Sequence, residues 1–349
     1  MIEVEEKYMA RCLELARCGL GHVSPNPMVG AVIVREGKII GEGFHRRFGE
    51  GHAEVNAIAS VRDASLLRDA TMYVSLEPCS HYGKTPPCAE LIIRKGIPRV
   101  VVGCLDPFPA VSGRGVKMLR EAGVEVVTGV MEREAIWLNR AFMTLQKRGR
   151  PYVILKWAQS EDGFIDRHRA DASEPVAILS TPVTTRLVHK LRSEVSAIMV
   201  GTRTALLDNP SLTVRHWQGA SPVRVVLDRQ LVIPPSNHLL DGAVRTLVYT
   251  SREAESRENV EYIRIDFERP VIPQVLAGLA ERRLDSLLVE GGTRLLDSFL
   301  ASGLWDEARV ETAPVRLEDG VRAPSLYGRA ERDLSAPEIV RFRNPESCL

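Results

Sequence analysis

The sequence is poor in cysteine and aromatic residues and contains no long apolar run. Its 349 residues include only 6 cysteines, so a small disulfide-stapled module is excluded. Aromatic residues make up 5%. No apolar stretch approaches the ~18 residues that a membrane-spanning helix needs, and we expect no membrane partner. Neither sign of charge dominates, because 46 Lys and Arg face 45 Asp and Glu, a net charge of +1. Without a basic field to attract a phosphate backbone, a dedicated nucleic-acid binder is disfavoured.

The first residues lack the features of a secretory signal. Glu3, Glu5 and Glu6 make this segment acidic, where a signal peptide has a basic region followed by an apolar one. We therefore expect a cytoplasmic protein whose cysteines stay reduced. In such a compartment cysteines are more often packing residues, metal ligands or nucleophiles than disulfide partners.

Length and composition favour two globular α/β domains. Hydrophobic residues make up 44% and charged residues 26%, as in folded soluble proteins, and a prior of ~150 residues per domain suggests two domains. Apolar runs typical of strands alternate with segments of helical period in both halves, which is the pattern of α/β layers. The polar run Lys147–Pro151, which contains Gly and Pro, marks the boundary. The predicted domains are residues 1–147 and 148–349.

The periodicity predicts the order of the elements in each domain. In the first domain we expect helices at 5–18, 52–60 and 88–95, strands at 29–34, 38–43, 71–76 and 99–104, and then helix, strand and helix through 131–146. In the second domain we expect strands at 152–157, 195–200, 223–227, 246–249 and 286–289, and helices at 183–192, 274–281 and 295–302. Two polar stretches, 251–259 and 315–334, are expected to be surface loops.

Three residues at the ends of predicted elements form a pattern of metal ligands. His52 begins a predicted helix, Cys79 follows Pro78 after a predicted strand, and Cys88 begins the next helix. One imidazole and two thiolates supply three ligands for Zn²⁺ and leave the fourth position to water, as in catalytic zinc sites. Glu54, two residues after His52, is the natural carrier of protons between that water and a leaving amine. The pattern His-x-Glu followed by Pro-Cys is the signature of zinc deaminases.

Each of these residues has a simpler explanation when it is taken alone. A single cysteine is more often buried packing, and a single histidine is more often a satisfied core residue. Their combined placement at two helix starts and one strand end favours the metal site. The usual motif has two residues between its cysteines, whereas eight separate Cys79 from Cys88, so a loop is inserted beside the predicted metal.

The first half of the chain closely resembles the deaminase half of the bifunctional deaminase/reductase family of riboflavin biosynthesis. The resemblance is carried by the inserted loop and by segments 25–30, 43–45 and 52–54. The second half looks like the reductase domain of the same family, so the resemblance covers nearly the whole chain. The matching segments there are 156–163, 191–193, 201–204, 208–215 and 289–292. It implies an α/β protein with a cytidine-deaminase-like three-layer domain followed by a domain similar to dihydrofolate reductase. It also implies Zn²⁺ and NADPH as cofactors.

For the first domain, the resemblance implies a pyrimidine substrate that carries ribose 5′-phosphate. It assigns His81, Lys84 and Thr85 to the ribose phosphate, and Asn26 and His45 to the polar edges of the substrate. The alternative for Lys84 is a solvated surface lysine.

The second half contains no G-x-G-x-x-G after a strand, so we expect no Rossmann domain. The chain instead has a predicted strand at 286–289, the pair Gly291 and Gly292, and a predicted helix. Glycines allow close approach of a ligand, and free N–H groups at a helix start attract phosphate. This turn alone is weak evidence, and NADPH binding here is implied by the resemblance around it.

The resemblance also distributes the roles in the second domain. It places the cofactor against Gln159, Thr204, Asp208, Gly292, Thr293, Arg294, Leu295, Leu296, Asp297 and Ser298. It places the substrate against Arg192, Leu212, Arg215 and Glu290, and guanidinium groups suit a phosphate. Lys156 lies near the reacting carbon by analogy and joins Glu54 as a catalytic candidate.

Plainer interpretations exist for three of these positions, and the chain departs from the family in two places. Residues 208–210 would also suit a plain turn, Arg192 a solvated helix end and Arg215 a surface charge. The aromatic residue that the family often has near Ile178 is missing. The usual Leu-Gly-Gly near the carboxyl terminus is replaced by residues 316–320.

The sequence therefore predicts an enzyme with two activities. Hydrolytic deamination of 2,5-diamino-6-ribosylamino-4(3H)-pyrimidinone 5′-phosphate would come first, and NADPH would then reduce the ribosyl group to ribityl. One alternative is an RNA or nucleotide base deaminase with a non-catalytic recognition domain, which the near-zero net charge disfavours. Another is a non-enzymatic zinc module, in which Glu54 has no role. The sequence leaves the oligomeric state open, including a homo-oligomer.

Overall fold

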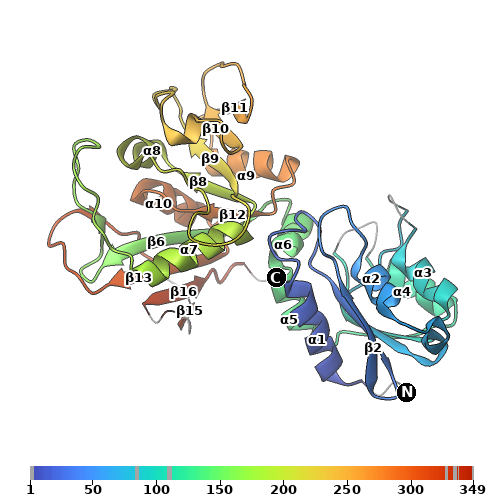
Figure 1. The fold of residues 1–349 in the computed structure, drawn as a ribbon. Helices are drawn as coiled ribbons and strands as arrows, with labels where there is room; N and C mark the ends of the chain where they lie inside the picture. The colour runs from blue at the N-terminus through green and yellow to red at the C-terminus, as the bar shows by residue number, and fades with distance from the viewer. Residues whose placement is uncertain are drawn as a thin grey trace. The chain divides into compact units, whose positions relative to one another are not determined.

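The computed structural model describes residues 4–82, 86–107, 112–326, 329–332, 336 and 338–347. The chain divides into two compact units, Met1–Gly149 and Arg150–Cys348, which Figure 1 shows in blue to green and in green to red. Each unit has its own sheet and its own core. None of the helices in the described ranges combines the length and the apolar character of a membrane span.

The first unit is built on a five-stranded sheet with the order β2-β1-β3-β4-β5. Its strands are β1 (Gly30–Arg35), β2 (Lys38–Phe44), β3 (Thr71–Leu76), β4 (Arg99–Cys104) and β5 (Glu125–Thr128). β1 pairs antiparallel with β2 and β3, whereas β3, β4 and β5 run parallel. The helices are α1 (Glu6–Arg17), α2 (Ala53–Ser60), α3 (Cys88–Lys95), α4 (Arg114–Glu121), α5 (Glu132–Leu138) and α6 (Arg140–Arg148), with a short 3-10 helix at Ala64–Asp69.

Alternating apolar residues bury both faces of this sheet. Ala31 and Ile33 of β1 share a core with residues of α2, α3 and α4. Val32 and Val34, which point the other way, pack against α1, and the residues of α5 and α6 extend that side. The result is a three-layer arrangement with helices on both faces (Figure 1), as predicted. Because both faces are covered, the central strands β1, β3 and β4 are mostly apolar and buried along their length, whereas β2 and β5 at the edges are partly exposed.

A glycine in β2 lets a functional helix lie against the sheet. A Cβ atom on Gly43 would stand 2.2 Å from the backbone nitrogen of Ala57 in α2. Only glycine allows this approach. The close contact fixes α2, whose first turn carries the candidate catalytic residues, directly over the strand.

The second unit is built on a nine-stranded sheet with the order β11-β10-β9-β8-β12-β6-β13-β16-β15. Its strands are β6 (Tyr152–Ser160), β8 (Ala197–Val200), β9 (Val223–Leu227), β10 (Thr246–Thr250), β11 (Val260–Arg264), β12 (Ser286–Val289), β13 (Glu307–Ala313), β15 (Arg329–Arg332) and β16 (Ile339–Arg343). The strands from β11 to β13 are parallel, and β16 and β15 are antiparallel to their neighbours. β7 (Phe164–Asp166) and β14 (Val321–Arg322) form a separate pair.

The helices of this unit are α7 (Pro182–Glu194), α8 (Thr202–Asp208), α9 (Val271–Glu281) and α10 (Thr293–Ser302), with a short 3-10 helix at His238–Leu240. Leu155 and Trp157 of β6 belong to the core cluster that α9 and α10 complete. Lys156, between them in the strand, faces the opposite side of the sheet. Its neighbour Glu311 contacts Thr184 of α7 on that side. Lys156 and Glu311 therefore lie on the α7 face.

Several elements of the second unit differ from the prediction. The stretch 251–259 is irregular, as expected, but 315–334 is not a continuous loop, because it contains β14 and β15. The strands β11, β13 and β16 and the helix α8 were not predicted. In β13 the charged residues Glu307 and Arg309 pair with each other at 2.6 Å. Pairing lets charged residues occupy a buried strand. A search for apolar runs in the sequence therefore does not detect β13.

Candidate active sites

The structure brings the three predicted metal ligands together in the first unit. His52 stands at the amino-terminal cap of α2, and Cys88 is the first residue of α3. Nδ1 of His52 lies 3.3 Å from Sγ of Cys88 and 3.6 Å from Sγ of Cys79, and all three ligand atoms lie within 4.8 Å of one another. Two sulfurs and one imidazole nitrogen at this spacing fit a tetrahedral Zn²⁺ whose fourth position is open.

Hydrogen bonds hold the two cysteines at this point. The backbone N–H of Cys88 donates to Sγ of Cys79 at 3.3 Å, and that of Ala89 donates to the carbonyl of Cys79 at 3.2 Å. The Cys88 thiol also lowers the pKa of Cys79 by hydrogen bonding to its sulfur. A thiolate is the form that ligates metal, so the local structure already favours the ligating state of Cys79.

Glu54 is placed for proton transfer beside this cluster. It lies in the first turn of α2, two residues after His52, and only 3% of it is exposed. Burial raises the pKa of this carboxyl group to about 7, although the nearby His52 opposes the shift. A carboxyl group that titrates near neutral pH can both accept and donate a proton.

His45 stands next to the cluster, and Asn26 lies beside His45; their predicted role at the polar edges of the substrate stays a prediction. The rings of His45 and His52 meet edge to face with centroids 5.5 Å apart. Nε2 of His45 lies 3.4 Å from the amide nitrogen of Asn26, and its Nδ1 lies 3.2 Å from the carbonyl of Gly51. Burial lowers the pKa of His45, so the ring is neutral and can donate at one nitrogen and accept at the other.

The remaining predicted residues of this site lie on the inserted loop. His81 is exposed there. Lys84 and Thr85 lie outside the described residues.

Sequence reasoning missed two residues that hold the first site in place. The carboxylate of Glu77 accepts four hydrogen bonds from backbone N–H groups, those of Asp106, Gly113, Gly115 and Val116. It thereby fixes the strand end from which Cys79 continues. The side chain of Asn139 accepts from the Met28 N–H at 2.8 Å and donates to its carbonyl at 2.9 Å. This clamp holds the segment that carries Asn26.

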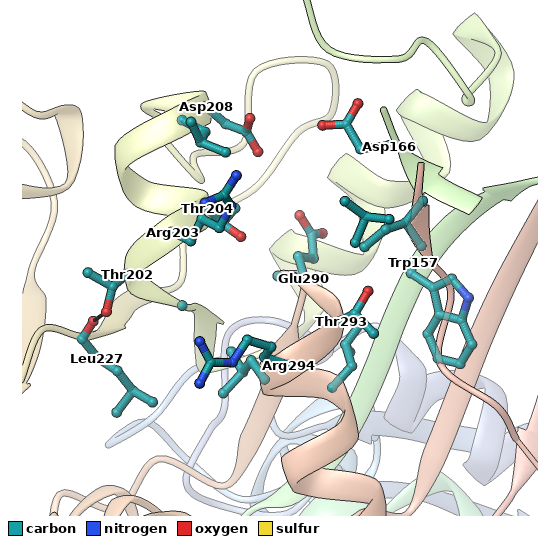
Figure 2. A pocket seen from close by; sticks show the side chains of 18 of the residues that line it. Trp157, Asp166, Thr202, Arg203, Thr204, Asp208, Leu227, Glu290, Thr293 and Arg294 are labelled. Atoms are coloured by element: carbon teal, nitrogen blue, oxygen red, sulfur yellow. Dashed lines mark hydrogen bonds between the residues drawn. The ribbon is translucent and has the colours of Figure 1, made fainter. Parts of the chain in front are cut away.

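The second unit contains a cavity of about 2010 Å³. Figure 2 shows residues of β6, α8 and α10 around it. Of the predicted cofactor residues, those that line it are Thr204, Asp208, Gly292, Thr293, Arg294, Leu295, Leu296 and Ser298. Gln159 and Asp297 are not among the lining residues. The amide oxygen of Gln159 instead accepts a hydrogen bond from the Trp157 indole at 2.9 Å.

The cavity fits a dinucleotide in size and chemistry. The amino terminus of α10 opens onto it after Gly291 and Gly292, and a Cβ on Gly291 would lie 2.9 Å from the Cα of Val200. The start of a helix attracts phosphate through its free N–H groups. Arg203 and Arg294 add positive charge to the wall (Figure 2). Together these features suit the phosphates of a nicotinamide dinucleotide.

Asp208 does not face the cavity as a free carboxylate. It forms an ion pair with Arg169, which also pairs with Asp166 at 2.7 Å. The Arg169 side chain is only 5% exposed. Sequence reasoning missed this arginine, which joins the segment after β7 to the end of α8. Asp208 is the last residue of α8, so the plain turn begins only at Asn209.

Lys156 and Glu290 line the cavity, and Arg192 is bound to Glu290. Arg192 binds Glu290 through a contact of 2.6 Å, and its side chain is only 12% exposed, so its interpretation as a solvated helix end is wrong. Although burial favours the neutral acid, Arg192 and Lys156 hold the pKa of Glu290 below its usual value. Arg192 lies behind Glu290 and does not line the cavity.

Leu212 and Arg215 are not among the residues that line the cavity. Leu212 is buried and has a φ of 52°. Arg215 is exposed, and its backbone N–H donates to Nδ1 of His189 at 2.9 Å. A direct role for either residue in substrate binding therefore stays a prediction.

Comparisons with known proteins identify the family of each unit. Residues 2–104 match the family described as the cytidine and deoxycytidylate deaminase zinc-binding region, and residues 151–340 match the RibD C-terminal domain. The class is thus a zinc-dependent deaminase domain joined to a reductase domain with NADPH as its cofactor.

The relatives extend over most of the chain. A riboflavin biosynthesis protein RibD from Bacillus amyloliquefaciens is 43% identical over 93% of this chain and 88% of its own length. A RibD from Escherichia coli is 36% identical over 99% and 98%. A crystal structure of a diaminohydroxyphosphoribosylaminopyrimidine deaminase/5-amino-6-(5-phosphoribosylamino)uracil reductase from Thermotoga maritima superposes with a TM-score of 0.86 at 39% identity, covering 97% and 98% of the chains.

The chain belongs to the RibD family of riboflavin biosynthesis proteins. The predicted family, the fold of each domain and the enzyme class are confirmed. The roles of individual residues stay predictions.

Proposed function

We propose that this chain deaminates 2,5-diamino-6-ribosylamino-4(3H)-pyrimidinone 5′-phosphate by hydrolysis and then reduces the ribosyl group of the product to ribityl with NADPH. One observation carries the proposal. The first unit holds the cluster of His52, Cys79 and Cys88 beside the buried Glu54. The second unit of the same chain holds a dinucleotide-sized cavity, which Lys156 and Glu290 line. The Thermotoga maritima relative is named for both activities.

In the first step, Glu54 moves the protons. A Zn²⁺ held by His52, Cys79 and Cys88 supplies the Lewis acidity that activates water near neutral pH. Glu54 accepts a proton from the attacking water and delivers it to the amine of the substrate, so that a C–O bond forms, the C–N bond breaks and ammonia leaves. Neutral His45 and Asn26 hold the polar edges of the pyrimidine, and His81, Lys84 and Thr85 hold its phosphate.

In the second step, Lys156 is the proton donor at the reacting sugar. NADPH supplies a hydride to C1′ of the ribose when it is bound. The bond between C1′ and the ring oxygen breaks, and the ammonium group of Lys156 gives that oxygen the proton that makes it a hydroxyl. Glu290 accepts hydrogen bonds from the substrate, and Arg192, Leu212 and Arg215 complete its site.

The cofactor lies along the cavity in this proposal. Thr204, Asp208 and the lining residues of 292–298 would hold NADPH there. Contacts of Gln159 and Asp297 with the cofactor stay a prediction, because neither residue lines the cavity. We also propose that residues 1–147 and 148–349 act as separate catalytic domains.

The setting of the enzyme follows from its chemistry. Because Cys79 and Cys88 must remain thiolates to bind metal, a reducing compartment such as the cytoplasm suits the protein. The near-balanced charge favours a small-molecule substrate over a nucleic acid. A homo-oligomer is compatible with this proposal.

Two assays on the purified chain test the proposal. With the diamino substrate alone, ammonia should appear; with NADPH added, absorbance at the nicotinamide band should fall only after deamination has begun. In a thermal-shift panel, NADPH should raise the unfolding temperature and short RNA should not. If NADPH is not oxidised when the deaminated substrate is supplied, the second domain has no reductase activity and the chain is a deaminase only. A shift by RNA instead would favour the base-deaminase alternative.

A further inference from the structure

A buried carboxylate behind the wall of the cavity has no role in the function described so far. Glu311 lies on β13, and only 2% of its side chain is exposed. Its strand runs beside β6, with Glu311 opposite Ala158. It does not line the cavity itself. A buried carboxylate is costly unless it is paired and hydrogen-bonded, so its partners indicate its purpose.

Three partners surround Glu311, and one of them is the candidate proton donor. Oε2 lies 3.8 Å from Nζ of Lys156, a distance of ion pairing rather than of direct hydrogen bonding. The hydroxyl of Ser180 donates to Oε2 at 2.7 Å, and that of Thr184 donates to Oε1 at 2.5 Å. Among the described residues, Lys156 is the basic side chain that lies within ion-pairing distance of Glu311.

The strands on either side of Lys156 place a carboxylate on each flank. β12 leads to Glu290 on one side and β13 carries Glu311 on the other. Glu290 is already held by Arg192 at 2.6 Å. Glu311 has no such arginine, and its negative charge is left to Lys156. The ion-pair partner of the Lys156 ammonium is therefore Glu311, which lies behind the cavity wall.

We propose that Glu311 is a positioning residue for the reductase step, which holds the ammonium of Lys156 at the cavity wall. This inference rests on the proposed function. A lysine side chain has a flexible four-carbon stem, and a fixed counter-charge restricts it to the orientation that proton transfer requires. Ser180 and Thr184 in turn fix Glu311 from the start of α7. Without Glu311, no fixed counter-charge would restrict the Lys156 side chain to that orientation.

The variant Glu311→Gln removes the charge while keeping the shape and one hydrogen-bond acceptor for the hydroxyls. The matched control is Glu307→Gln, because Glu307 is also buried on β13 but pairs with Arg309. In the full chain, Glu311→Gln should lower the reductase kcat about 10- to 100-fold, with the Kd for NADPH and the deaminase rate unchanged. Glu307→Gln should leave the reductase kcat near that of the unchanged chain.

A second readout does not depend on activity. Acetylation of Lys156 by a water-soluble succinimidyl ester, quantified by peptide mass spectrometry, should rise several-fold in Glu311→Gln, because the side chain is no longer held against β13. It should stay unchanged in Glu307→Gln. If the unchanged chain shows no reduction at all, the proposed function fails, while the labelling still decides the role of Glu311.

The inference is overturned if kcat and labelling in Glu311→Gln match those of the unchanged chain. It is also overturned if both glutamine variants lose reduction, NADPH binding and stability alike, since that pattern means a structural role. Should Glu311→Gln fail to fold, Thr184→Val decides, because it frees one oxygen of Glu311 without removing charge. That variant should raise the labelling of Lys156 and lower kcat, and unchanged values would count against the inference.

Discussion

At the scale of single residues, the first site depends on ligands from three separate segments of the chain. His52 and Cys88 each stand at the start of a helix, and Cys79 lies beyond a strand end that Glu77 fixes to backbone N–H groups. None of the three can be replaced by a neighbour, because the fold sets their positions. The metal should therefore be lost when one ligand is removed.

The unchanged chain should carry about one zinc per molecule, and Cys79→Ser should lose most of it, because a serine hydroxyl is a poor ligand beside a single thiolate. Elemental analysis of the purified proteins measures this directly. Cys18→Ser is the matched control, since Cys18 is exposed on the surface and should keep the full metal content. Full zinc in both Cys79→Ser and Cys88→Ser would rule out the site.

Glu54→Gln should keep zinc but lose deamination by ~10²–10⁴-fold, because an amide fills the same space and cannot cycle protons. Reduction of the deaminated substrate should continue, since that step takes place in the other unit. Ammonia release and NADPH oxidation, measured separately, check both statements. An unchanged rate of ammonia release would show that Glu54 is only structural.

His189 makes the stability of the second unit depend on pH. Burial, with Arg192 and Arg215 nearby, lowers the pKa of His189 from 6.5 to about 4, so the folded chain holds the ring neutral where the unfolded chain protonates it. This contribution to stability is complete above about pH 6.5 and is lost as the pH falls toward 4. His189→Asn, which retains an acceptor for the Arg215 N–H, should lose less stability over that interval. Urea unfolding at pH 7 and pH 5 measures it, and parallel losses would refute the assignment.

Among the elements, β6 and its neighbour β13 are joined at their starts by an ion pair between Arg150, just before β6, and Asp306, just before β13. Arg150 donates two hydrogen bonds to Asp306, at 2.6 and 2.8 Å, and Asp306 also accepts from the Val153 N–H. Both charged side chains are buried. A buried carboxylate that loses its partner is strongly destabilising.

Arg150→Met should therefore cost about 3–5 kcal/mol of unfolding free energy. The control is Arg264→Met, because the pair of Arg264 with Glu253 is exposed and should be worth less than about 1 kcal/mol. Chemical denaturation of the full chain, followed by a tryptophan signal of the second unit, gives both values. Equal and small losses in the two variants would show that the buried pair contributes nothing to the fold.

The elements of the first unit could be predicted closely from the sequence because their local signals agree with the fold. Its central strands are mostly apolar runs between two helical layers. Gly96, with a φ of 69°, follows α3 and ends it at the predicted residue, Lys95. In the second unit, β13 alternates apolar residues with Glu307, Arg309 and Glu311. Tertiary partners stabilise those charges, and no local pattern shows them.

The same contrast applies to the sites. His52, Cys79 and Cys88 were visible because each stands at the end of a predicted element. Glu77, Asn139, Arg169 and Glu311 were not, because their partners are backbone groups or side chains far away in the sequence. Sequence spacing shows only which groups are close along the chain, and not which groups the fold brings together.

At the scale of the whole molecule, the account assigns consecutive reactions to two units that each have a separate core. A fragment from residue 148 onward should then fold alone, because Arg150 and its partner are both included. It should oxidise NADPH only with the deaminated substrate. Circular dichroism and the nicotinamide assay check this, and a folded fragment that neither binds NADPH nor reduces the substrate would show that the second unit has lost its function.

Two sites of one chain should carry out the two reactions in order, and mixing two variants, each defective at one site, shows whether they do. NADPH oxidation is measured with the diamino substrate for Glu54→Gln alone, for Lys156→Ala alone and for their mixture. Each variant alone should give little oxidation, because one step is missing, and the mixture should restore it as the deaminated product of Lys156→Ala reaches the intact reductase site of Glu54→Gln. Rapid oxidation by Glu54→Gln alone, or a mixture that stays inactive while Lys156→Ala releases ammonia, would contradict the account.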